Sequence, residues 1–256
     1  ELVRMLVRVA LEAGAPFVRI ETLGNNATSD HRLRLVVRTD VRSATSVADA
    51  AFGLVDREPV RVPAAHARME KPIQTAPLHR YVSHFDARRG VTIYADGPGE
   101  YESVKGGVAI TLLRSVGELP RNDLGERPGH AGWPATTPDA QCLGPFSAGI
   151  AVMLHGPRND DVTDTIERTA HDVLSPLVGD TLRSALSVPQ PTDGIALEGA
   201  GLAFSALKES EDGAWTVLRC VNLREQPTTG RWIVPRALNE ERVARLHETP
   251  GDALDL

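Results

Sequence analysis

The chain has few of the residues that mark several common classes of protein. Aromatic residues make up 4% of its 256 residues, and cysteine occurs only as Cys142 and Cys220. Two cysteines are a poor disulfide framework for a secreted domain, and their apolar or mixed neighbours predict buried thiols rather than a bridge. No apolar run reaches the length of about 20 residues that a transmembrane helix needs. These absences favour a soluble cytoplasmic protein without a membrane partner.

The chain also lacks a strong excess of positive or negative charge. The formal net charge is -6, and the sequence pI is about 5.8. Lysine occurs only at Lys71, Lys105 and Lys208, so the basic residues are almost all arginine, which we interpret as a compositional bias. The sequence therefore predicts no surface for nucleic acid. It also lacks the glycine-rich phosphate loop with its Gly-Lys-Ser/Thr end.

Short apolar segments separated by glycine and proline fill most of the sequence. The 22 glycines and 18 prolines lie between these segments, where they favour turns, and this pattern is typical of an all-β sandwich. Alternation predicts strands in residues 3–11 and 17–22, joined by a turn at residues 14–16. Further strands are expected near residues 33–37, 80–85, 201–208, 215–223 and 232–234, while residues 236–246 fit either a strand pair or a short helix.

Two segments suggest how the chain is divided. Apolar residues recur at a helical period from Val162 to Leu177, which predicts a short helix or a loop that crosses the end of the sandwich. The following segment SVPQPTD, residues 187–193, has the composition of a linker. We therefore predict a large β-sandwich over residues 1–189 and a small β module over residues 190–256.

The most informative stretch is residues 91–132. Alternation over residues 91–96 predicts a half-buried strand, and the apolar run at residues 108–113 predicts a more buried one. Between them lies the breaker cluster Asp-Gly-Pro-Gly at residues 96–99. After them comes a loop, residues 114–127, that is too charged to belong to a core. This succession predicts side chains presented at the edge of a sandwich.

The same stretch resembles the C-terminal β-domain of glycoside hydrolase family 38, the α-mannosidases. It is most similar to the bacterial branch that includes mannosylglycerate hydrolases, whose pattern reads here GVTIYADGPGEYESVKGGVAITLLRSVGELPRNDLGERPGHAG. The resemblance implies a large β-sandwich of the mutarotase-like supersandwich type, followed by a small C-terminal β-sandwich module. Further matching pieces occur in order at residues 25–26, 30–34, 138–144, 204–208 and 217–222.

The resemblance also implies a function. The family is zinc-dependent and retaining, and its N-terminal catalytic domain supplies an aspartate nucleophile and His/Asp zinc ligands. We find no counterpart of these motifs, and Glu1 is an unusual first residue for a natural chain. We therefore expect a non-catalytic C-terminal portion of an α-mannosidase, without catalytic residues, metal ligands or cofactor of its own. The implied partners are the N-terminal catalytic domain, which would hold the zinc, and an α-mannoside substrate.

By the resemblance, the charged loop lies against the catalytic domain, where its arginines reach the edge of the substrate pocket. A planar guanidinium suits sugar hydroxyls and also a carboxylate such as that of glyceryl mannoside. The predicted rim residues are Arg114, Arg121, Asp123 and Arg127. The alternative is that these side chains form ion pairs or are simply solvated. Eukaryotic members carry paired arginines and paired aspartates near here, whereas this chain has a single Arg114 and then Arg121-Asn122-Asp123.

Other polar residues are expected to be structural. His84 and Asp86 share a strand face, but zinc needs three or four ligands. Glu100 and Glu102 are expected to be solvated turn residues. His31 and Arg34 belong to the matching piece at residues 30–34, which we interpret as a signature of the fold; the alternative is that they brace strand ends by hydrogen bonds.

Two other functions stay open. A stand-alone carbohydrate-binding sandwich would need an aromatic platform, which the low aromatic content disfavours. An aldose-epimerase-like enzyme would need a histidine acid and a carboxylate base in one cleft, with His79, His84 or His155 as candidates. The accessory-domain hypothesis instead predicts a large exposed apolar patch, through which the chain could also form a homo-oligomer.

Overall fold

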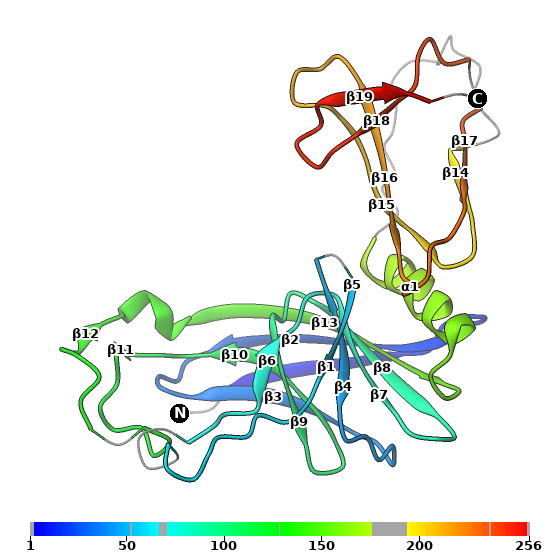
Figure 1. Cartoon of the computed structure of the whole chain (residues 1–256). Helices are drawn as coiled ribbons and strands as arrows, with labels where there is room; N and C mark the ends of the chain where they lie inside the picture. The colour runs from blue at the N-terminus through cyan, green and yellow to red at the C-terminus, as the bar shows by residue number, and fades with distance from the viewer. Residues whose placement is uncertain are drawn as a thin grey trace, which may run out of the picture. The chain divides into compact units, whose positions relative to one another are not determined.

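The computed structural model describes residues 3–51, 53–66, 71–127, 129–175, 194–235 and 237–254. Among these residues, strands outnumber helices by nineteen to two, which confirms the all-β prediction (Figure 1). The chain divides into two compact units, one of Glu1–Val162 with Thr169–Pro176 and the other of Thr163–Arg168 with Leu177–Leu256. The predicted linker at residues 187–193 lies outside the described residues.

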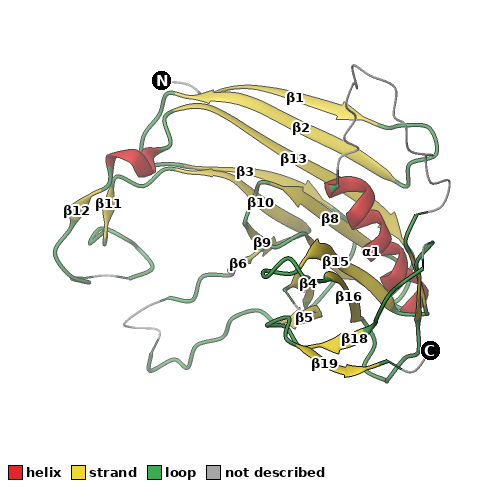
Figure 2. Ribbon diagram, turned by 90° about the horizontal axis from the view of Figure 1, so that it is seen from above, coloured by secondary structure: helices red, strands yellow, loops and turns green. Residues whose placement is uncertain are grey.

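The first unit contains a seven-stranded antiparallel sheet, which includes the predicted hairpin around residues 14–16. In that hairpin Val7 lies opposite Thr22 and Val9 opposite Ile20, so the alternation of both strands is in register. Across the sheet the order is β1 (Arg4–Ala10), β2 (Phe17–Asn26), β13 (Gly144–His155), β8 (Gly90–Asp96), β7 (Tyr81–Phe85), β4 (Ser46–Ala50) and β5 (Gly53–Arg57). Figure 2 shows β1, β2 and β13 side by side.

A four-stranded antiparallel sheet forms the second layer of the sandwich. Its order is β3 (Arg32–Arg38), β10 (Gly107–Arg114), β9 (Glu100–Val104) and β6 (Thr75–Pro77). Beyond these strands, β11 (Glu118–Leu119) and β12 (Ala135–Thr136) pair with each other. Both views place this small pair at the end of the sandwich away from the helix (Figures 1 and 2).

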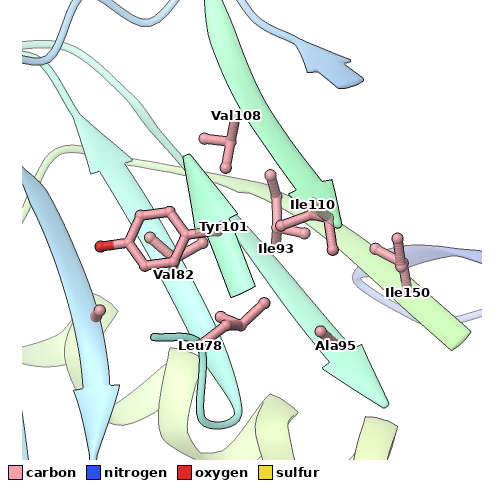
Figure 3. Close-up of a cluster of buried hydrophobic side chains, with 9 residues drawn as sticks. Leu78, Val82, Ile93, Ala95, Tyr101, Val108, Ile110 and Ile150 are labelled. Carbon is pink, nitrogen blue, oxygen red and sulfur yellow. The ribbon is translucent and has the colours of Figure 1, made fainter. Parts of the chain in front are cut away.

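The core of the first unit lies between the two sheets. Ile93 and Ile150 of the larger sheet pack with Val108 and Ile110 of the smaller one (Figure 3). Ile93 and Ile110 have no exposed surface, and burying such side chains contributes about 1.5–3 kcal/mol each. Tyr101 of β9 joins this cluster through its ring, and its hydroxyl points away from Ile150.

The strand at residues 90–96 is more buried than its alternation predicts, so the expectation of a half-buried strand is wrong. All residues of β8 except Asp96 are buried. The reason is that β8 is a central strand whose outer face is also covered. The hydroxyl of Tyr94 reaches Met153 on the neighbouring strand, and Met153 is contacted by Thr169 of the helix.

The predicted helix exists as α1 (Asp160–Leu174). Asn159 caps it, because its side-chain oxygen accepts a hydrogen bond from the backbone N–H of Val162 at 2.8 Å. The apolar positions Ile166 and Ala170 are buried, as the helical period requires. None of the helices in the described part of the chain is long and apolar enough to cross a membrane.

Among its described residues, the second unit contains three antiparallel strand pairs and the helical segment Thr163–Arg168. A turn at residues 211–213 joins two of the strands, and in it Gly213 adopts a left-handed φ of 72°. Asp212 accepts hydrogen bonds from Ser210 Oγ and the backbone N–H of Ala214, and these bonds lower its pKa. The pairs are β14 (Ala196–Glu198) with β17 (Arg231–Ile233), β15 (Leu202–Glu209) with β16 (Thr216–Asn222), and β18 (Arg242–Ala244) with β19 (Pro250–Ala253).

Both cysteines are exposed free thiols, so the prediction that they are buried is wrong. Cys142 follows the short 3-10 helix Pro138–Gln141 in a left-handed conformation with φ 49°. Cys220 lies on β16, where it alternates with partly buried neighbours. Neither residue is held in the apolar environment that its sequence neighbours indicated.

Candidate functional site

Three of the segments that carry the family pattern meet at the end of β2. Asn26, which is 1% exposed, is the residue that joins them. Its Nδ2 donates hydrogen bonds to Ser115 Oγ at 3.3 Å and to the carbonyls of Gln141 and Cys142 at 3.1 and 3.0 Å. Its Oδ1 accepts the backbone N–H of Thr28. One buried amide thus fixes chain segments that are up to 116 residues apart.

Asp30 ties the same segments together from the surface. It adopts a left-handed φ of 54°, and its Oδ1 accepts hydrogen bonds from the Gly117 backbone at 2.9 Å and from Arg121 Nη1 at 3.0 Å. Gln141 both donates to this oxygen and accepts the Asp30 backbone N–H. A Cβ at Gly117 would lie 2.5 Å from Gln141 Nε2 and 2.8 Å from Asp30 Oδ1, so a larger residue there would displace these two side chains. We call the hydrogen-bonded group around Asn26 and Asp30 the junction.

Three of the four predicted rim residues lie together beside this junction. Arg121 binds both carboxylate oxygens of Asp123, at 2.9 and 2.7 Å, in addition to Asp30. The hydrogen bonds from Arg121 lower the pKa of Asp123, and the carboxylate in turn raises the pKa of Arg121. Arg127 donates to the backbone carbonyl of Arg121 at 3.3 Å. The loop is thus ordered by its own ion pairs, which was the alternative interpretation of these residues.

Arg114, the fourth predicted rim residue, belongs to a different group of charges on the outer face of the smaller sheet. It forms an ion pair with Glu100 at 2.9 Å, and Glu100 also binds Arg32 at 2.6 Å. Glu102 binds Arg34. The expectation that both glutamates are solvated turn residues is therefore wrong. They alternate with buried Tyr101 on β9, which turns them toward arginines of β3 and β10.

His31 holds the end of its strand through its backbone and not through its ring. Neither of its ring nitrogens has a hydrogen-bond partner among the described residues, although both are buried. The bracing contact comes from its backbone carbonyl, which accepts the N–H of Ser115 at 2.8 Å.

An exposed apolar surface begins beside the junction. β1 is an edge strand, and its residues Leu6 and Val9 are each 64% exposed. The register places Met5 opposite Gly24, close to the junction residue Asn26 at the end of β2. Soluble proteins rarely leave such an edge open. We call these exposed apolar residues the β1 strip; Met5, Val7 and Val9 lie on one face of the sheet and Leu6 and Leu23 on the other, with Leu11 beyond the end of β1.

A cavity of about 1230 Å³ lies elsewhere in the first unit, lined by both sheets. His84 and Asp86 both line it, but they do not form an acid–base pair. His84 Nε2 bonds Ser103 Oγ at 2.9 Å, while Asp86 accepts the backbone N–H groups of Arg88 and Arg89 in its own turn. Asp86 therefore closes a turn, and the hydrogen bond from Arg88 is the main reason that its pKa is lowered.

The other two histidines proposed for an epimerase lie outside this cavity. His79 Nδ1 is 2.6 Å from buried Asp49, but Arg80 also binds both oxygens of that carboxylate. His155 bonds Thr92 Oγ1 at 2.8 Å and has no carboxylate partner in the part of the chain that is described. Among the described residues, no group of three or more His, Cys, Asp or Glu side chains is arranged to hold a metal.

Comparison with known proteins identifies relatives of this chain. A protein of Halalkalibacterium halodurans, provisionally named a mannosylglycerate hydrolase, is 29% identical over 225 residues, which are 88% of this chain and 23% of the relative. An α-mannosidase structure from Enterococcus faecalis V583 superposes with a TM-score of 0.72 at 27% identity, over 87% of this chain and 24% of that one. The chain is thus related to the α-mannosidases of glycoside hydrolase family 38.

A second structure supports the same relationship. A family 38 glycosyl hydrolase from Enterococcus faecalis superposes with a TM-score of 0.71 at 26% identity, over 89% of this chain and 25% of that one. No family model matches the chain. The chain spans about a quarter of the length of these α-mannosidase relatives. The predicted resemblance is therefore confirmed, and it extends over nearly all of this chain.

Buried His84 and partly buried His155 are expected to make the stability of this mannosidase-related unit dependent on pH. Burial lowers the pKa of His84 and of His155 below the ordinary value of 6.5. As the pH falls below 6.5, the unfolded chain takes up protons at these sites before the folded chain does. The stability that the neutral rings contribute is therefore complete above pH 6.5 and is lost as the pH falls through their folded-state pKa values.

We expect the midpoint temperature of thermal unfolding to decrease as the pH is lowered from about 7 to about 5. His84→Gln should make this fall smaller, because one of the two titrating rings is gone. The same substitution at exposed His66 is the control and should leave the slope unchanged. A slope that His84→Gln does not alter would contradict this account of the pH dependence.

Proposed function

We propose that the chain is the C-terminal, non-catalytic portion of a retaining, zinc-dependent α-mannosidase. In this proposal the nucleophile and the zinc ligands belong to an N-terminal catalytic domain, and the full-length protein hydrolyses α-mannosides. The observation that carries the proposal is the exposed β1 strip beside the junction, in a chain that matches a quarter of its α-mannosidase relatives. A catalytic domain of the same polypeptide is the partner that we propose covers this strip.

The four rim residues would have different roles in this arrangement. Arg121 has its guanidinium committed to Asp30 and Asp123, so we assign it to positioning of the loop. Arg127 supports the same loop through the Arg121 carbonyl. The Arg114 side chain is 58% exposed and has one carboxylate partner among the described residues, which leaves donors free for a sugar hydroxyl or a carboxylate. We therefore propose Arg114 as the residue that contacts substrate.

The proposed contact is tested by Arg114→Ala in the full-length protein. Loss of a charge-assisted hydrogen bond to the substrate should lower kcat/KM by a factor of about 10 to 150, since such bonds contribute about 1.5–3 kcal/mol. Arg231→Ala is a matched control, because Arg231 is an exposed arginine that also pairs with one glutamate, Glu198. Equal values of kcat/KM for the two variants would show that Arg114 does not contact substrate.

A stand-alone carbohydrate-binding sandwich is the second candidate. It is favoured by Trp133, whose side chain is 90% exposed beside β12 and makes an edge contact with His130. An exposed indole can stack on a sugar face. This function predicts that the 256-residue chain binds mannosides and that Trp133→Ala abolishes the binding. The cytoplasmic location of the protein and its association with itself stay predictions.

A further inference from the structure

The cavity in the first unit has a polar floor although it opens between two sheets. Three buried polar side chains from different strands contribute to it, namely Ser46 of β4, His84 of β7 and Tyr101 of β9. Tyr101 buries its ring in the core, and Figure 3 shows its hydroxyl at the side away from Ile110 and Ile150. The core therefore ends at this hydroxyl, and the cavity begins there.

The polar groups of the floor are held in place before any ligand binds. The Tyr101 hydroxyl and Ser46 Oγ are 2.7 Å apart, and Arg57 Nη1 donates to the same hydroxyl at 3.3 Å. Arg57 also lies over the tyrosine ring and donates to the carbonyl of Pro77. His84 is oriented by Ser103. Preorganised donors and acceptors of this kind suit hydroxyl groups, because a ligand then loses little binding energy to ordering of the site.

The wall of the cavity has an excess of positive charge. Its lining contains five arginine or lysine side chains and three carboxylates. Two of the carboxylates, Asp40 and Asp86, share Arg89 at 3.9 Å each. Arg42, Arg88 and Lys105 have no ion-pair partner within the described ranges of the chain, whereas Glu58 is the one lining carboxylate in the same situation. A bound anion would therefore meet cations that the described residues do not neutralise.

We propose that this cavity is a binding site for a small anionic polyol, such as a sugar phosphate. The cationic wall at Arg42 and Arg88 would bind the anionic group, and the floor formed by Tyr101, Ser46 and His84 would bind the hydroxyls. The volume of about 1230 Å³ exceeds the range of about 300–1,000 Å³ typical of ligand sites, so a monosaccharide derivative fits with room for water. None of these residues belongs to the junction or to the predicted rim, so this site is independent of the proposed mannosidase function.

The test measures binding of three probes to the 256-residue chain by isothermal titration calorimetry and ¹⁵N NMR. The probes are D-glucose 6-phosphate, D-glucose and inorganic phosphate. We expect saturable binding of the sugar phosphate at one site, with affinity at least about tenfold higher than for either other probe. The NMR shifts should be largest at residues 42–46, 84–89 and 101–105.

Variants separate the two halves of the site. The double variant Arg42→Gln/Arg88→Gln should weaken sugar-phosphate binding about tenfold or more, and Tyr101→Phe should weaken it while keeping the buried ring. Arg158→Gln is the control, because Arg158 is an exposed arginine of the same unit outside the cavity. Lys105→Gln replaces the double variant if the latter does not fold.

Three results would overturn the proposal. They are the absence of saturable sugar-phosphate binding, an affinity that the arginine variants leave unchanged, and equal affinity for inorganic phosphate. None of these results bears on the mannosidase proposal, whose test uses Arg114.

Discussion

Replacement of Asn26 by alanine is expected to lower the free energy of unfolding by about 3 kcal/mol. The substitution removes an amide that donates to Ser115, Gln141 and Cys142 and accepts from Thr28. Since the site is 1% exposed, water cannot replace these bonds without a change of structure. Unfolding in urea, followed by circular dichroism, measures the loss.

The neighbouring residue offers a matched control for this prediction. Asn25 has the same side chain one position earlier on β2, but it is exposed and no hydrogen bond of its side chain is seen in the described chain. Asn25→Ala should therefore change stability by less than about 0.5 kcal/mol. Similar losses for the two variants would show that the junction does not depend on the buried amide. In the Asn26→Ala variant we also expect faster hydrogen exchange of the backbone amides in residues 115–119.

The strands of the first unit could be predicted wherever one face of a strand is buried and the other is exposed. β3 shows why, since Leu33, Leu35 and Val37 are more buried than Arg34 and Val36 between them. The pattern gave less information for β8, because helix α1 and the opposite sheet cover both of its faces. β9 was missed as a strand, because its Glu-Tyr-Glu-Ser-Val sequence contains only two apolar positions.

The junction could be predicted only in part. The family resemblance selected residues 25–26, 30–34 and 138–144, and the structure brings these segments together around Asn26 and Asp30. No local pattern could have indicated the contacts themselves, because they join residues about 90 to 116 positions apart. The ion pair of Arg121 with Asp123 was within reach of sequence reasoning, since the two residues are two positions apart in one loop.

The cavity left no signal in the sequence that we recognised. Its wall comes largely from the irregular segment at residues 39–45 and from turns at residues 86–89 and 105–106, which have no periodicity. Its floor uses Ser46, His84 and Tyr101, and each of these residues alone is an ordinary strand residue. Their convergence follows from the packing of the two sheets, which depends on long-range contacts.

Hydrolytic activity of the 256-residue chain tests the central proposal most directly. The purified chain is incubated with an α-mannoside and zinc, and the intact Enterococcus faecalis α-mannosidase serves as the reference. We expect no turnover above the rate without protein, because we assign the nucleophile and the zinc ligands to a catalytic domain outside this chain. Zinc-dependent hydrolysis by the chain alone, lost on chelation and restored by zinc, would contradict the assignment of this chain as a non-catalytic portion.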